Sequence, residues 1–209
     1  MSKSVYSLVL MDRLVEEVDR LAYARGTSRS NLINQILAEA LSFVTPEKRI
    51  SDIFARLETA MGAADGFKLS LQSGDSMLSL QSSLRYKYNP TIRYQLALYR
   101  NPTDAFGELR VYFRTKSPAL LEHLTRFFVF WAKLECAVTG HEIKYEISPG
   151  KLVRKLSASG SDPERLADAC AKYITLFDTS LKLYFDNPAR CDEIHAMYLD
   201  YHRKGNAIS

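Results

Sequence analysis

Apolar side chains recur at two different spacings along this chain of 209 residues. Between residues 12 and 62 they return every three or four positions, which predicts amphipathic helices over about 12–25, 28–41 and 46–61. Residues that favour helix ends stand at the limits of these segments: Asp12, Gly26, Thr27 or Ser28, Thr45 with Pro46, and Gly62.

From residue 67 onward the spacing changes to two, which is typical of half-buried strands. We expect strands within 67–73, 77–88, 91–100, 108–115 and 141–147. Helical spacing returns after Pro118, after Pro163 and in the last segment, which opens with NPARC. The pattern predicts an α+β fold, in which helices back an antiparallel meander with one solvated face.

The first apolar segment, SVYSLVL at 4–10, poses a separate problem. Its β-branched and aromatic residues favour a strand, yet the sequence that follows is helical as far as residue 62. A strand must pair its backbone N–H and C=O groups, and no second strand lies nearby in the sequence.

Three consecutive pieces resemble the ribbon-helix-helix DNA-binding module, the fold of the Arc and MetJ repressors. They are the strand SVYSLVL, the helix DRLVEEVDRLAYARG and the helix opened by GTSRSNLI. The resemblance implies that SVYSLVL pairs antiparallel with the same strand of a second chain. The protein would then be an obligate homodimer with an intermolecular two-stranded ribbon, and a higher oligomer stays open.

The resemblance also implies where double-stranded DNA is bound. The ribbon would enter the major groove and read bases with the outward side chains Lys3, Val5, Ser7 and Val9. The valines depart from the polar pattern of the family, because they contact thymine methyls but donate no hydrogen bond. Phosphate would be held at the start of the second helix by Thr27, Ser28, Arg29, Ser30 and Asn31. Taken alone, TSRS is also typical of an ordinary helix cap.

The net charge of +4 is spread unevenly. Residues 66–116 carry eight basic and three acidic side chains. On the expected wet face of the sheet we place five of the basic residues, interleaved with Tyr99 and Tyr112: Arg85, Lys87, Arg93, Arg110 and Arg114. This set is either a second nucleic-acid surface or an ordinary solvated sheet face.

Catalytic and metal-binding motifs are missing from the sequence. It contains no P-loop, dinucleotide-binding turn, nucleophile elbow or H-E-x-x-H, and SPGK at 148–151 lacks the Walker spacing. Cys191 and His195 have a spacing that suits a metal, with His202 near the same face, but no other region supplies a matching cluster. We therefore expect no enzyme activity, no metal and no cofactor.

Three widely spaced cysteines and the absence of a spanning apolar run favour a cytoplasmic, nucleoid-associated protein without membrane contact. We expect three parts: a ribbon-helix-helix module (1–45), a linker helix (46–62) and an α+β domain for oligomerisation or for ligand or partner binding (63–209). The expected function is that of a dimeric, sequence-specific transcriptional regulator, a repressor. The alternative is a ribbon-helix-helix scaffold whose C-terminal domain binds a protein partner, as in an antitoxin, with weak or no specific DNA binding.

Overall fold

The structure is a computed structural model that describes residues 5, 7–62, 66–71, 76–157, 162–205 and 208. The chain divides into two compact units, Met1–Arg49 and Ile50–Ser209, which we describe separately.

The first unit contains the helices α1 (Asp12–Ala24) and α2 (Arg29–Ala40). Asp12 is the first helical residue of α1 and not its cap, because Met11 occupies the cap position without a side-chain hydrogen bond. At the start of α2, the Ser28 hydroxyl accepts a hydrogen bond from the Asn31 N–H at 3.3 Å. Gly26 makes the turn between the helices with φ of +60°, a conformation that glycine adopts without strain.

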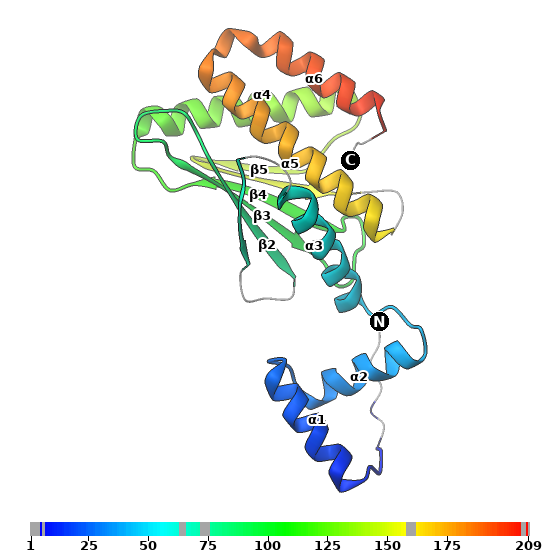
Figure 1. Cartoon of the computed structure of the whole chain (residues 1–209). Coiled ribbons are helices and arrows are strands. Elements are labelled where there is room, and N and C mark those ends of the chain that lie inside the picture. The colour runs from blue at the N-terminus through cyan, green and yellow to red at the C-terminus, as the bar shows by residue number, and fades with distance from the viewer. Residues whose placement is uncertain are drawn as a thin grey trace. The chain divides into compact units, whose positions relative to one another are not determined.

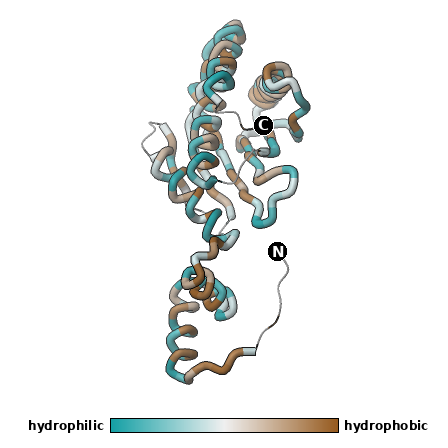
Figure 2. The backbone as a smooth tube through the Cα atoms, turned by 90° about the vertical axis from the view of Figure 1, so that its right-hand side faces the viewer, coloured by the Kyte–Doolittle hydropathy of each residue, from teal (hydrophilic) through white to brown (hydrophobic). Residues whose placement is uncertain are grey.

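The core of the first unit is very small. It consists of Val18, Ala22 and Leu32, with Leu21 and Ile33 partly buried beside them. Many large apolar side chains of the unit are exposed instead: Val5, Leu8, Val9, Met11, Leu14, Tyr23, Ile36, Leu37, Leu41, Phe43 and Val44. Figure 2 shows the segment just before α1 as a continuous hydrophobic run. The described residues of this unit therefore leave these large apolar side chains uncovered.

The segment SVYSLVL is described at residues 5 and 7–10, and these residues lie in neither a helix nor a strand. Lys3, Ser4 and Tyr6 lie outside the described residues. A strand that pairs only with a second chain has no partner within a single chain. The expected intermolecular ribbon thus remains a prediction.

The second unit is built on a six-stranded antiparallel sheet (Figure 1). Its strands are β1 (Lys68–Leu71), β2 (Met77–Ser83), β3 (Thr91–Leu98), β4 (Gly107–Phe113), β5 (Tyr145–Ser148) and β6 (Lys151–Leu156). Their order is β1-β2-β3-β4-β6-β5, so the expected meander spans the first four. Strand β6 was not expected. The SPGK segment is the turn into it, with Gly150 at φ of +72°.

Three helices lie on one face of this sheet, and a fourth, the last in the chain, packs against two of them (Figure 1). They are α3 (Pro46–Gly62), α4 (Pro118–Thr139), α5 (Pro163–Asp186) and α6 (Cys191–Arg203), the last preceded by the short 3-10 turn η1 (Pro188–Arg190). The predicted starts of α4 and α5 are confirmed, because the side chains of Ser117 and Asp162 cap them. In Figure 1, α3 and α5 cross the strands on the same side of the sheet. The α+β class is therefore confirmed.

The expected linker helix differs from what the structure contains. Ile50, Ile53, Leu57 and Met61 of α3 are almost completely buried in the core of the second unit. The division between the units falls after Arg49, within this helix. Most of α3 is thus a core element of the second unit, because its apolar stripe packs against that unit.

Candidate nucleic-acid interface

The residues expected to bind phosphate gather at the first turn of α2. Arg29, Ser30 and Asn31 are exposed there, next to the half-buried Thr27. The first N–H groups of a helix have no partner within the helix, and the first turn of α2 contains no acidic residue. The positive end of the helix dipole is therefore not neutralised from within the helix.

Two of these side chains already have partners in the first unit. The Ser28 hydroxyl caps the Asn31 N–H, so Ser28 acts as a helix cap. The Arg29 guanidinium makes two hydrogen bonds of 2.5 Å to the carboxylate of Asp19 on α1, and this contact raises the pKa of Arg29. Both side chains are about half exposed, and solvent weakens such pairs. Phosphate can therefore compete with Asp19 for Arg29.

The residues expected to read bases are only partly described. Val5, Ser7 and Val9 are exposed, and Lys3 lies outside the described residues. Val5 and Val9 have relative exposures of 98% and 103%, so no described residue of the first unit covers them.

Only part of the second expected nucleic-acid surface, the basic set on the sheet, is assembled in the structure. Arg93 on β3 and Arg110 on β4 lie on the face of the sheet away from the helices, which we name the outer face. Arg85 and Lys87 do not, because β2 ends at Ser83 and both lie in the β2–β3 connection. Arg114 follows the end of β4. The expected strand over 77–88 was thus too long, because β2 ends at Ser83 and the connection to β3 begins directly after it.

Arg110 belongs to a charge cluster around Glu108. Arg110 and Lys155 both pair with this carboxylate, and the Tyr99 hydroxyl donates to it at 2.8 Å. Burial alone would raise the pKa of Glu108, but the hydrogen bonds from Lys155, Tyr99 and Arg110 outweigh it and lower that pKa to about 2. The charges of Arg110 and Lys155 are therefore partly neutralised at this place.

A buried ion pair in the second unit was missed by the sequence reasoning. Glu135 on α4 and Arg154 on β6 are both 0% exposed, with Arg154 Nε at 2.9 Å from the carboxylate. The hydroxyls of Tyr173 and Tyr198 donate to the same carboxylate at 2.9 and 2.8 Å. Arg154 also donates to the carbonyl of Ile208. This network, which we name the Glu135 network, joins α4, α5, α6 and β6 and includes the carbonyl of Ile208.

We next consider a metal site, the Cys191 thiol and membrane-spanning helices. Among the described residues, no group of three or more His, Cys, Asp or Glu side chains is placed to hold a metal. The Cys191 thiol donates to the carbonyl of Pro188. None of the helices that the structure describes is both long and apolar enough to cross a membrane.

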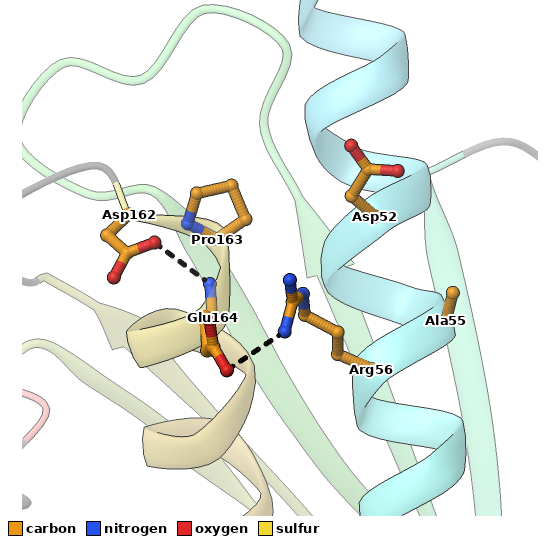
Figure 3. A pocket seen from close by; sticks show the side chains of 6 residues that line it. All are labelled: Asp52, Ala55, Arg56, Asp162, Pro163 and Glu164. Carbon is orange, nitrogen blue, oxygen red and sulfur yellow. Dashed lines mark hydrogen bonds and ion pairs between the residues drawn. The ribbon is translucent and has the colours of Figure 1, made fainter.

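A shallow pocket lies between α3 and the start of α5 (Figure 3). Its lining residues are Asp52, Ala55, Arg56, Asp162, Pro163 and Glu164. Arg56 points across it and pairs with Glu164 at 3.1 Å. The basic group that would attract an anion is thus already paired, and acidic side chains surround it.

Comparison of the chain with protein-family models, with curated proteins and with solved structures gave no match. The function is therefore inferred from the residues described above.

Proposed function

We propose that the protein is a dimeric, sequence-specific DNA-binding transcriptional regulator whose first unit is a ribbon-helix-helix module. The observation that carries this proposal is the apolar surface of that unit. The described residues of this unit form a core of only three buried side chains, which is too small to stabilise the unit, because domains of this size bury little surface. A second copy, pairing through the segment before α1, would cover much of the exposed apolar set.

The expected gain from dimerisation is large compared with the core of one chain. Full burial of a Leu, Val or Phe side chain stabilises by about 1.5–3 kcal/mol. Leu8, Leu14 and Leu37 are between 44% and 61% exposed, so burying the rest of each contributes roughly 1 kcal/mol, and twice that in a two-fold dimer. Pairing two SVYSLVL segments would also satisfy their backbone groups.

DNA binding is supported by the first turn of α2. The N–H groups of Arg29 and Ser30, the helix dipole and the exposed side chains of Arg29, Ser30 and Asn31 suit a phosphate. Phosphate contacts of this kind position a protein on duplex DNA without selecting a sequence. Sequence preference would come from Ser7 and from thymine contacts of Val5 and Val9.

The test is selection of bound fragments from randomised duplex DNA with the full-length protein, together with sedimentation analysis of its mass. We expect a dimer and a motif with two spaced half-sites. Arg29→Ala should weaken duplex binding and make its salt dependence less steep by about 1 for each phosphate that the variant no longer binds, with the dimer intact. Arg25→Ala is the matched control, since Arg25 is an exposed arginine just beyond the end of α1.

A second function is favoured by the exposed valines and by the pairing of Arg29 with Asp19. In this alternative the first unit is a dimerisation scaffold, and the second unit binds a protein partner. A dimer that recovers no DNA fragments, and in which Arg29→Ala changes nothing in cells, would support this alternative. A monomer at micromolar concentration would contradict both functions.

A further inference from the structure

The register of the six strands aligns one residue from each into a row on the outer face of the sheet. The row runs Lys68, Gln81, Arg93, Tyr112, Lys151 and Ser148 in the order β1-β2-β3-β4-β6-β5. We name it the cationic row. Its members are exposed or half-buried, whereas the sheet residues of the core belong to the opposite face.

The spacing of the row follows from the sheet. Neighbouring strands lie about 4.8 Å apart, so the three cations, on every second strand, are separated by about 10 Å at the backbone. The whole row spans roughly 24 Å. Tyr112 stands between Arg93 and Lys151, so its ring lies between two of the three cations along the row.

No described acidic side chain neutralises the charge of the cationic row. The row contains no acidic residue, and none of its three cations is ion-paired with a described residue. By contrast, Arg110 and Lys155 are held by Glu108 in the adjoining rows. Positive charge is therefore concentrated along one line of the outer face.

This composition selects among the surfaces that could cover the row. A second copy of the chain facing the row would bring six cations together, with no acidic residue in either row to pair with them, which is unfavourable. A lipid surface calls for apolar side chains that insert, and the row contains none. A polyanion with flat bases fits both the cations and the central tyrosine.

We propose that the cationic row binds single-stranded nucleic acid, with phosphates at Lys68, Arg93 and Lys151 and a base stacked on Tyr112. The strand would lie across the β-strands of the sheet. This site is separate from the duplex-binding surface of the first unit and does not depend on it.

The test measures binding of the full-length protein to a fluorescein-labelled oligothymidylate of about 12 nucleotides, over a range of salt concentrations. The double variant Arg93→Ala/Lys151→Ala should bind more weakly, and its salt dependence should be less steep by about 1.4, since each phosphate contact on a single strand contributes about 0.7. The matched control is Arg126→Ala/Arg165→Ala, which removes the same charge from exposed positions on α4 and α5. It should bind like the wild type.

Tyr112 is tested by two substitutions. Tyr112→Ala should weaken binding by about 5-fold to 150-fold, the range for one stacked base, whereas Tyr112→Phe should keep the stacking and the affinity. Arg29→Ala should leave single-strand binding unchanged, which separates this site from the first unit.

Three results would overturn the proposal. They are equal losses in the row variant and its control, loss of single-strand binding in Arg29→Ala, and equal row-dependent losses for single strand and duplex. A fourth result would also overturn it: failure of the wild type to bind the oligonucleotide, whether or not an acidic peptide or anionic vesicles bind through the row.

Discussion

Replacing Arg154 by methionine is the sharpest perturbation of the second unit. The guanidinium is fully buried and pairs with Glu135, which also accepts hydrogen bonds from Tyr173 and Tyr198. Methionine fills similar space without a charge. It leaves the Glu135 carboxylate buried without a counter-charge and the Ile208 carbonyl without this donor.

The expected magnitude follows from the missing partner. Breaking a buried pair by removing one member costs about 3–5 kcal/mol, because the remaining charge stays desolvated. For a unit of this size each kcal/mol lowers the melting temperature by about 2–4 °C, so we expect a decrease of roughly 6–20 °C. Glu135→Gln should lower the free energy of unfolding by a similar amount, since it leaves the charge of Arg154 buried without a partner.

The double variant Glu135→Gln/Arg154→Met separates the pair from the packing around it. It buries no unpaired charge, and the amide oxygen of Gln can still accept from one tyrosine. We expect a loss close to that of one single variant and well short of the sum of both.

The assay is urea unfolding followed by the fluorescence of Trp131. The chain has one tryptophan, and its indole N–H donates to the Tyr173 hydroxyl at the edge of the Glu135 network. The signal therefore reports the unfolding of the second unit alone. A loss below about 1 kcal/mol for Arg154→Met, or strictly additive losses in the double variant, would refute the reasoning.

Three further predictions concern single residues of the second unit. Because the folded pKa of Glu108 is about 2, below its unfolded value of about 4.3, its ion pairs stabilise fully above pH 5 and lose their effect as the pH falls towards 2. The difference in unfolding free energy between wild type and Glu108→Gln should thus shrink from about 1–2 kcal/mol at pH 6 to near zero at pH 2, after allowance for its half-exposed partners. Gly107→Ala should destabilise by about 1–3 kcal/mol in urea, because a Cβ there would lie 2.4 Å from the carbonyl oxygen of Ala97. Burial raises the pKa of Cys170 to about 12, so this thiol should react with an aromatic disulfide reagent at pH 8 only after unfolding, later than the two half-buried cysteines.

The local elements were largely predictable because each carries its own signal. The caps Ser28, Ser117 and Asp162 mark the starts of α2, α4 and α5 as expected. The recurrence of apolar residues at every second position identified β2, β3 and β4, although it did not show where β2 ends. The role of α3 was not predictable, because an amphipathic helix shows that it packs without showing against which unit.

The cationic row depends on information that the sequence does not contain locally. Lys68, Arg93 and Lys151 come from three segments far apart in the chain, and only the strand order and the register align them. Arg85, Lys87 and Arg114 were expected on the sheet instead, because each follows the alternation of a strand that ends before it. A basic and aromatic outer face was thus predictable, but the set of side chains that forms it was not.

Strand β6 was missed because one member of the buried ion pair, Arg154, interrupts its apolar alternation. In KLVRKL the alternation places Leu152, Arg154 and Leu156 on the core face and Val153 on the outer face, so an arginine stands where an apolar residue is expected. Glu135 breaks the pattern of α4 in the same way, at the end of the buried series Leu124, Phe128, Trp131. One basic and one acidic residue, each within the apolar stripe of its own element, can be buried together only as a pair. Two such exceptions of opposite sign in one domain indicate a contact between their elements, but Asp178, buried on α5, is a second acidic exception, so this rule leaves both α4 and α5 as candidate partners of β6.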